Sequence, residues 1–251
     1  MSKGEPARRA LRWVGPSGIA LSIVAPLTIV LVAYTLLHTP TVPVADALPM
    51  PTVSASAQKT PTPPASTTTA PRPVVAFLGD SYAAGAGASA PANGWADRVS
   101  LQQGWVEKNL SRNLTSYSTA GEPGGTSYQS RLGALVATGA QIVVVSGGRG
   151  DVGVGATQFR ADVRATLAGI HASLPKATIV VVSPIWGNDP APARLVAVGA
   201  SVQAEAARAG ATYLDIGEPL AGQAALVGPD GWHPNDAGHA AIAAAVEKAL
   251  G

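Results

Sequence analysis

Residues 142–146 read Ile-Val-Val-Val-Ser, and residues 178–183 read Thr-Ile-Val-Val-Val-Ser. Such nearly continuous runs of β-branched residues are typical of strands in a parallel sheet whose two faces are both covered by helices. The patterns on either side predict three further strands, at residues 74–78, 105–110 and 212–216. The helical stretches between them lie at residues 95–103, 158–174, 191–209 and 236–250. This alternation predicts an α/β fold, a three-layer α/β/α sandwich around a mainly parallel five-stranded sheet.

An uncharged segment lies upstream of these strands. Residues 18–37 contain no charged side chain, and at 1.5 Å per residue a helix of this length spans the ~30 Å hydrocarbon core of a bilayer. Residues 1–17 carry four basic side chains against one acidic one, whereas the next basic residue after the apolar run is Lys59. The positive-inside rule therefore predicts one transmembrane helix or signal anchor, with residues 1–17 in the cytoplasm and the rest of the chain outside the cell membrane.

A cleaved signal peptide is the alternative to an anchor. Residues 45–47 read Ala-Asp-Ala, an A-x-A cleavage pattern, so the chain would be secreted if it is cut near Ala47. The apolar run is longer than the usual ~7–15-residue core of a signal peptide, which favours the retained anchor. Residues 38–73 contain nine prolines and eight threonines but three charged side chains, which predicts a disordered linker. Residues 74–251 form the predicted globular domain.

Composition excludes several classes of protein. The chain contains no cysteine, which rules out disulfides, thiolate metal sites and a cysteine nucleophile. Four histidines leave little material for a histidine-built metal centre, so we expect no metal and no organic cofactor. The net charge of +2 comes from the N-terminal segments, because residues 74–251 hold 11 basic and 13 acidic side chains. The predicted domain therefore lacks the electrostatic basis for nucleic-acid binding. We also expect it to be a monomer.

Side chains with catalytic chemistry stand near the two ends of the predicted domain. Gly79-Asp80-Ser81 follows the first strand, so the Ser81 hydroxyl is expected where parallel sheets bind ligands, beyond the carboxyl ends of the strands. Asp230 precedes His233 by three residues, just before the last helix, for which Asn235 is the predicted N-cap. An aspartate at this spacing can accept a hydrogen bond from the histidine Nδ1 and leave Nε2 free as a base toward a serine.

Other candidates are interpreted as structural. Asp236 and His239 repeat the same spacing, but they fall in the first turns of the last helix, where Asp236 suits the positive end of the helix dipole. Trp95, Trp186 and Trp232 could form the wall of a substrate site. In a chain with only 5% aromatic residues, however, we expect tryptophan in the core.

In this order and beside these elements, the motifs resemble those of the SGNH (GDSL-type) hydrolases over essentially the whole of residues 74–251. Gly79-Asp80-Ser81 is similar to the family's first block, and Asp230-x-x-His233 to its fifth. Gly148-Arg149-Gly150-Asp151 has the frame of the third block, G-x-N-D. The glycine of the second block is best matched by Gly124, with Gly121 and Gly125 as alternatives. The resemblance implies an SGNH/flavodoxin-like fold and an ester hydrolase whose catalytic triad is Ser81, His233 and Asp230.

The resemblance also implies an oxyanion hole, made by the backbone N–H groups of Ser81 and Gly124 and by the side-chain amide of an asparagine. Gly150 stands at the position of that asparagine and has no side-chain donor. Loss of one such donor typically lowers the rate by ~10²–10³. The Gly150 N–H, Arg149 or Asn188 could replace it, although Asn188 is more simply an ordinary loop residue. Arg149 could equally meet an anionic substrate or lie on the surface in solvent.

These observations favour an exported, membrane-anchored serine esterase that hydrolyses short-chain O-acyl esters on cell-envelope glycans or lipids. Residues 18–37 would be its contact with the membrane. Two alternatives remain open at this point. One is an O-acyltransferase that uses the same triad, with a glycan hydroxyl in place of water. The other is a catalytically impaired carbohydrate-binding domain, which only Gly150 favours and which the retained Ser81, Asp230 and His233 argue against.

Overall fold

The computed structural model describes residues 71–119 and 124–251. The basic N-terminal segment, the predicted membrane helix at 18–37, the alternative cleavage site and nearly all of the predicted linker lie outside the described residues. Among the residues that are described, no helix combines the length and the apolar character needed to cross a membrane.

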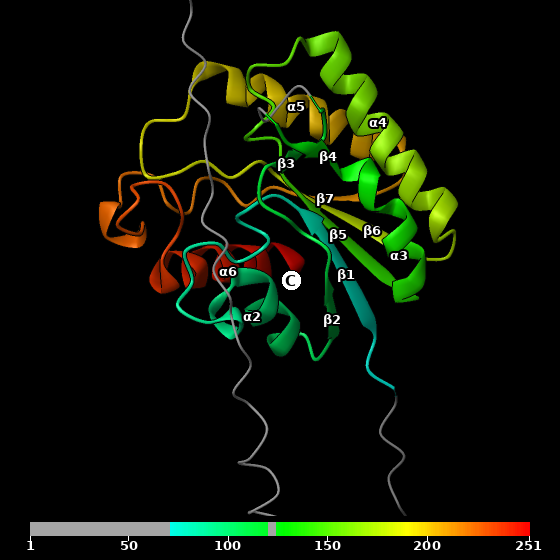
Figure 1. Ribbon diagram of the computed structural model, residues 1–251, viewed down its shortest axis with the longest axis horizontal. Helices are drawn as coiled ribbons and strands as arrows, with labels where there is room; N and C mark the ends of the chain where they lie inside the picture. The colour runs from blue at the N-terminus through cyan, green and yellow to red at the C-terminus, as the bar shows by residue number, and fades with distance from the viewer. Residues whose placement is uncertain (1–70, 120–123) are drawn as a thin grey trace, which may run out of the picture. The chain divides into compact units, whose positions relative to one another are not determined.

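The central sheet contains five strands, and every pairing between neighbours is parallel (Figure 1). Its order is β2-β1-β5-β6-β7. The strands are β1 (Val74–Gly79), β2 (Val106–Asn109), β5 (Ile142–Ser146), β6 (Thr178–Val182) and β7 (Thr212–Leu214). The predicted sheet is thus confirmed, with strand ends shifted by one or two residues. A separate two-stranded parallel pair, β3 (Thr115–Ser116) with β4 (Thr126–Ser127), was not predicted.

Helices cover both faces of this sheet, which confirms the three-layer α/β/α sandwich (Figure 1). One layer holds α2 (Trp95–Gln102) and α6 (Asp236–Leu250). The other holds α3 (Leu132–Thr138), α4 (Ala156–Ser173) and α5 (Ala193–Arg208). Short 3₁₀ turns lie at Pro91–Asn93, Tyr128–Arg131 and Ala224–Leu226. The short helix α3 had no counterpart among the predicted elements.

Two hydrophobic clusters follow from the alternation of side chains along the strands. Leu78 and Val145 face the layer of α3, α4 and α5, whereas Phe77 and Val144 face the layer of α2 and α6. Because successive side chains of a strand point to opposite faces, a strand that is covered on both sides must be apolar at every position. This explains why the central strands read as unbroken Val/Ile runs.

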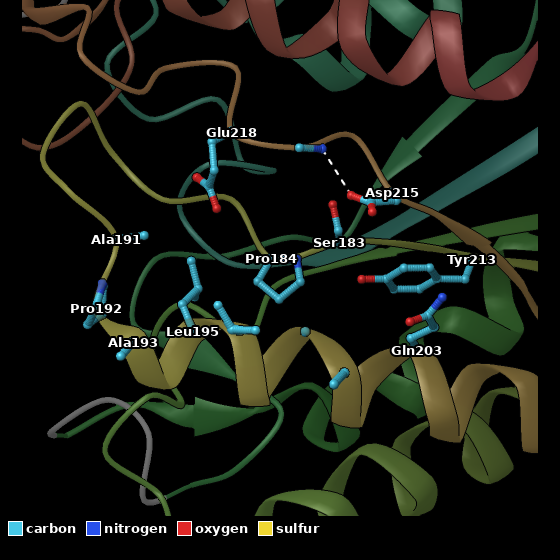
Figure 2. A pocket seen from close by; sticks show the side chains of 14 residues that line it. Ser183, Pro184, Ala191, Pro192, Ala193, Leu195, Gln203, Tyr213, Asp215 and Glu218 are labelled. Atoms are coloured by element: carbon cyan, nitrogen blue, oxygen red, sulfur yellow. Dashed lines mark hydrogen bonds between the residues drawn. The ribbon is translucent and has the colours of Figure 1, made fainter.

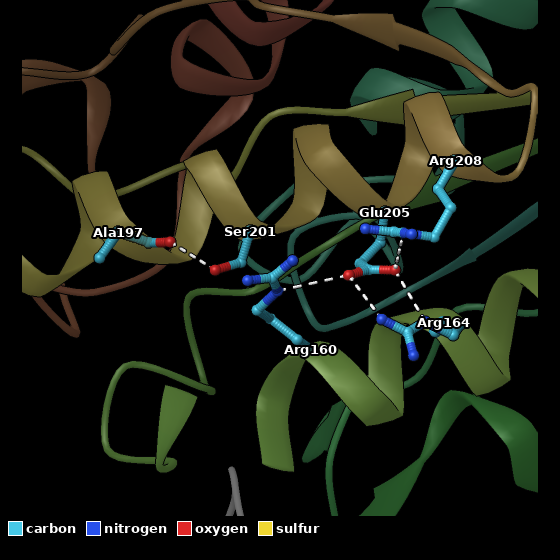
Figure 3. A network of polar contacts seen from close by, with 6 residues as sticks. All are labelled: Arg160, Arg164, Ala197, Ser201, Glu205 and Arg208. Atoms are coloured by element: carbon cyan, nitrogen blue, oxygen red, sulfur yellow. Dashed lines mark hydrogen bonds and ion pairs between the residues drawn. The ribbon is translucent and has the colours of Figure 1, made fainter. Parts of the chain in front are cut away.

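A buried carboxylate joins α4 to α5 (Figure 3). The side chain of Glu205 on α5 is fully buried, and its two oxygens form ion pairs with Arg160 at 3.3 Å, Arg164 at 3.0 Å and Arg208 at 3.4 Å. Arg164 donates to both oxygens of Glu205. The hydrogen bond from Arg164 is the main reason that the pKa of Glu205 is lowered. The charge of Glu205 is therefore stabilised in the folded state.

We expect Glu205→Gln to lower the midpoint of thermal unfolding by about 2–4 °C, because the substituted amide pairs weakly with half-exposed arginines. A carboxyl group whose pKa is lowered by folding stabilises the protein above the unfolded pKa of about 4.3, and this contribution disappears as the pH falls through the folded pKa. The difference between wild type and variant should therefore shrink below about pH 4. Glu247→Gln is the control, since Glu247 forms no ion pair among the described residues.

Candidate active site

The candidate site lies at the carboxyl edge of the sheet, where β1 sits between β2 and β5 (Figure 1). The segments that follow β1 and β5 diverge at this point, and such a topological switch point is where open α/β sheets bind ligands. Ser81 comes two residues after the end of β1, and Arg149 three residues after the end of β5. The fold thus brings two segments of the predicted site to one place.

The loop after β1 presents Ser81 at this edge. Its first turn is held by backbone hydrogen bonds from Ala84 N to Asp80 O and from Ala86 N to Ser81 O, both 2.9 Å. The Asp80 carboxylate accepts a bond of 2.9 Å from the N–H of Tyr82. Burial raises the pKa of Asp80, although a neighbouring arginine charge opposes this effect. Ser81 itself is buried, with 6% of its surface exposed.

Asp230 and His233 form the pair that their spacing predicted. Asp230 Oδ2 lies 2.6 Å from His233 Nδ1, and Oδ1 accepts bonds of 3.0 Å from the N–H groups of Trp232 and His233. The hydrogen bond to His233 is the main reason that the pKa of Asp230 is lowered to about 2. These bonds favour the ionised form of Asp230, and they engage the histidine through Nδ1 and not through Nε2.

The loop that carries His233 packs directly on the loop that follows Ser81. Gly87 has a φ of +89°, and a Cβ at this position would lie only 2.3 Å from Pro234 O and 2.9 Å from His233 Cβ, so the close approach requires glycine. The Tyr82 hydroxyl donates to Trp232 O at 2.6 Å, and the Tyr82 ring lies 6.1 Å from the His233 ring. The two ends of the domain meet at the site.

Arg149 also contacts the site, so of its two equally weighted interpretations the solvated surface position is wrong. It is only 5% exposed, and its Nη2 lies 3.4 Å from Ser81 Oγ. Among the described residues, this is the hydrogen bond that Ser81 Oγ receives, and none joins it to His233. Catalytic hydrogen bonds are often long or unformed without substrate, so the missing bond does not argue against His233 as the base.

The tryptophans do not share one environment. Trp95 is fully buried, as predicted, and packs edge-on against Phe77 at 5.4 Å between ring centroids. Trp232 is 46% exposed, so its prediction as a core residue was wrong. Its ring lies 6.2 Å from that of Trp186 and 4.3 Å from the guanidinium carbon of Arg149. Trp232 therefore forms part of the site wall.

Asp151, the last residue of the third predicted block, holds the segment that leads to the second block. The Asp151 carboxylate accepts bonds from the N–H groups of Tyr117 at 3.1 Å and Ser118 at 2.9 Å. It is fully buried, and burial is the main cause that raises its pKa to about 7. Thr115 Oγ1 donates to Gly79 O at 2.9 Å and so connects this segment to the end of β1. The sequence had suggested no role for Asp151 beyond its place in the motif.

For the predicted oxyanion donors Gly124 and Gly150 the structure gives positions along the chain but no hydrogen bond with Ser81 among the described residues. Gly124 has a φ of +72° and precedes β4, whereas its alternative Gly121 lies outside the described residues. Gly150 follows Arg149 and is half-buried. Asn188 lies in the loop after β6, where its carbonyl accepts from Gly222 N at 2.9 Å, and no hydrogen bond among the described residues joins it to Ser81. The donor roles of Gly124 and Gly150 stay predictions.

The second Asp–His pair, Asp236 and His239, makes structural contacts. Asp236 accepts bonds from the N–H of Ser89 at 2.7 Å and from its hydroxyl at 2.5 Å. His239 is fully buried, its Nδ1 accepts from Trp95 N at 3.3 Å, and its Nε2 lies 3.0 Å from Ala86 O. Both side chains thus attach the Ser81 loop to α6. This agrees with their interpretation as structural residues.

A cavity lies beside this site. It has a volume of about 460 Å³ and opens between the start of α5 and the ends of β6 and β7 (Figure 2). Its walls include Leu195, Tyr213 and Glu218, but neither Ser81 nor His233 lines it. Glu218 accepts a bond of 3.3 Å from Trp186 N, which links the cavity to the site wall. No group of three or more potential metal ligands occurs among the described residues.

Comparisons with known proteins agree with this arrangement. Residues 77–241 match the model of the GDSL-like lipase/acylhydrolase family. The GDSL lipase Rv0518 of Mycobacterium tuberculosis is 28% identical over 182 residues, covering 67% of this chain and 78% of that protein. The psychrotrophic esterase EstA from Pseudoalteromonas sp. superposes with a TM-score of 0.58 at 18% identity, over 71% of this chain and 96% of that chain. A family two carbohydrate esterase from Clostridium thermocellum, in complex with cellohexaose, gives 0.56 at 17% identity, over 71% and 65%.

The chain belongs to the GDSL-like lipase/acylhydrolase family, since the family match covers more than half of its length. It is an ester hydrolase of the SGNH type. The family resemblance read from the four short motifs is therefore confirmed. The solved structures share its α/β fold with a mainly parallel five-stranded sheet.

Substitution of the two histidines distinguishes the pair predicted to be catalytic, Asp230 and His233, from the pair interpreted as structural, Asp236 and His239. His233→Ala should lower kcat by about 10³-fold or more, because the base is removed. His239→Ala should leave most of the activity of the folded protein, but it should lower the free energy of unfolding by about 2–4 kcal/mol, because two buried backbone groups lose their partner. Ester hydrolysis and denaturant unfolding of the full-length chain measure both effects. Equal loss of activity in the two variants would contradict the assignment.

Proposed function

We propose that this hydrolase is an exported serine esterase that uses Ser81, His233 and Asp230 as its catalytic triad. The observation that carries the proposal is the 2.6 Å contact between Asp230 and His233, on a loop that packs against the turn holding Ser81. Ser81 stands at the end of β1, on the edge of the sheet where ligands are expected. Membership of the GDSL-like lipase/acylhydrolase family supports an ester as the bond that is cleaved.

The proposed mechanism has two halves. Ser81 Oγ attacks the carbonyl carbon of the ester and passes its proton to His233 Nε2, while Asp230 stabilises the imidazolium that forms. The tetrahedral intermediate then collapses, and the alcohol leaves with the proton from His233. Water, activated by the same histidine, hydrolyses the acyl-enzyme. The backbone N–H groups of Ser81 and Gly124 are the proposed donors to the oxyanion in both halves.

We assign the substrate to short-chain O-acyl esters on glycans or lipids of the cell envelope. A small-residue run, Ala83–Ala90, follows the nucleophile and suits small acyl groups. Trp232 contacts Arg149, which contacts Ser81, and its side chain is exposed enough to pack against a sugar ring or an acyl chain. The uncharged run at 18–37 and the basic residues before it support export and anchoring.

Labelling of the nucleophile tests the triad. The full-length chain, purified in detergent, should hydrolyse short-chain aryl esters and form one covalent adduct with an aryl phosphonate at Ser81, identified by mass spectrometry. Ser81→Ala should abolish both reactions, because it removes the proposed nucleophile. Ser201→Ala is the matched control, since the Ser201 hydroxyl bonds within α5 to Ala197 O. A rate that survives Ser81→Ala would refute the triad.

Topology is tested in cells. The chain should sediment with membranes, and protease added to spheroplasts should digest the domain at 74–251, because the charge distribution around 18–37 places it outside. A C-terminal epitope tag reports the cleavage on an immunoblot, with a cytoplasmic protein as the intactness control. A full-length chain found soluble in the cytosol would contradict export. A mature chain that begins near Leu48 would instead favour the cleaved signal peptide.

A further inference from the structure

Arg149 is a cationic side chain placed against the proposed nucleophile. Its Nη2 lies 3.4 Å from Ser81 Oγ, although 68 residues separate the two in the sequence. It is 5% exposed, and a guanidinium stays protonated in proteins. A positive charge that is withdrawn from water and directed at a nucleophile has a clear use in ester hydrolysis, where negative charge develops next to that nucleophile.

The backbone that carries Arg149 is held in one conformation. Gly148 has a φ of +110°, which favours glycine strongly. A Cβ at this position would lie 3.1 Å from both Pro184 Cγ and Val198 Cγ1, so the turn is packed against α5 and the loop after β6. The turn therefore has little freedom to move Arg149 away from Ser81.

Two aromatic rings contact the guanidinium group of Arg149. Its central carbon lies 4.4 Å from the ring centroid of Tyr82 and 4.3 Å from that of Trp232. The Tyr82 hydroxyl is itself bonded to Trp232 O, so the two walls are joined. Among the described residues, no carboxylate forms an ion pair with Arg149, and its Nε has no hydrogen-bond partner. Stacking leaves the in-plane N–H groups available to donate.

We propose that Arg149 is a catalytic residue, whose clamped guanidinium donates through Nη2 to the oxyanion and replaces the asparagine amide that Gly150 cannot supply. The proposal rests on the proposed esterase mechanism with Ser81 as nucleophile. It adds a donor that the family's usual set does not contain. A hydrogen bond from a charged donor to an anion is roughly twice as strong as one between neutral groups, so one arginine can stand in for one amide.

The Ser81 Oγ–carbon bond forms, the carbonyl π electrons move to the oxygen, and the Oγ proton goes to His233 Nε2. The resulting oxyanion is two bonds from Oγ, within reach of an Nη2 that already lies 3.4 Å from Oγ. On collapse the electron pair returns, the ester C–O bond breaks, and the alcohol takes the proton from His233. Arg149 keeps its own protons throughout.

The test replaces Arg149 in the full-length chain in detergent and measures hydrolysis of a neutral aryl butyrate. Arg149→Met keeps the length of the side chain but removes the donors, and it should lower kcat by about 10²–10³-fold with KM changed less than about threefold. Inactivation by a neutral aryl phosphonate should slow in parallel, because its phosphoryl oxygen takes up charge at the same place. Arg194→Met is the matched control, since Arg194 bonds to Val154 O and does not contact Ser81.

A second variant separates catalysis from folding. Gly150 does not have a positive φ, so left-handed backbone strain does not oppose an asparagine at this position. Adding Gly150→Asn to Arg149→Met should recover at least about tenfold in kcat, which a merely structural loss would not allow. If Arg149→Met does not fold, Arg149→Lys takes its place. It keeps the charge but loses the planar fork, and it should lower kcat at least about tenfold.

Several results would overturn the proposal. One is a kcat within threefold of wild type in Arg149→Met, or in Arg149→Lys where the former does not fold. Another is a loss confined to KM for an anionic monosuccinate ester, which would make Arg149 a binding residue for substrate carboxylates. The proposed function fails separately: in that case the wild-type chain shows no hydrolysis and no Ser81 adduct, or its activity survives Ser81→Ala, and the Arg149 proposal falls with it.

Discussion

The site depends on the contact between the loop after β1 and the segment that begins just before α6. Tyr82 and Trp232, which are 150 residues apart, are joined by a hydrogen bond, and Ala86 O lies within hydrogen-bond distance of His239. Gly87 lets the two backbones approach to a distance that a Cβ would prevent. Ser81 and His233 lie on separate loops from opposite ends of the domain, and this contact holds the two loops together. A proposed proton transfer therefore rests on a tertiary contact made largely by backbone atoms and one glycine.

Burial around this contact changes the behaviour of several charged groups. Desolvation raises the pKa values of Asp80 and Asp151, while Asp230, which lies on the more open side, has its pKa lowered by the bond to His233. Helices on both faces of a parallel sheet exclude water from the interior, so a charge kept near it needs a specific partner. Asp151 finds partners in two backbone N–H groups, whereas Arg149 is held by two aromatic faces. The bonds to Asp151 order a neighbouring loop, whereas the ring contacts of Arg149 leave its N–H donors available toward Ser81.

The elements missed by the sequence analysis share a physical cause. β3 and β4 are two residues long and exist only because Thr115 and Thr126 are brought into register, so no periodic pattern marks them. Helix α3 has seven residues, too few for a clear amphipathic repeat. Trp232 was expected in the core because composition alone cannot show that the loop before α6 places it over a buried guanidinium. For β3, β4 and Trp232 a contact across the fold decides the outcome, whereas α3 is too short for its pattern to be recognised.

The sequence by itself determined the order of strands and helices, the three layers and the bonded pair of Asp230 and His233. These features follow from short-range causes: unbroken apolar runs, helical periodicity and a spacing of three residues within one loop. Only the tertiary structure decided that Arg149 lies against Ser81, because that contact requires β5 to pair with β1 and two aromatic rings to contact the guanidinium. A side chain's burial and direction depend on residues distant in the chain, and no local pattern encodes them.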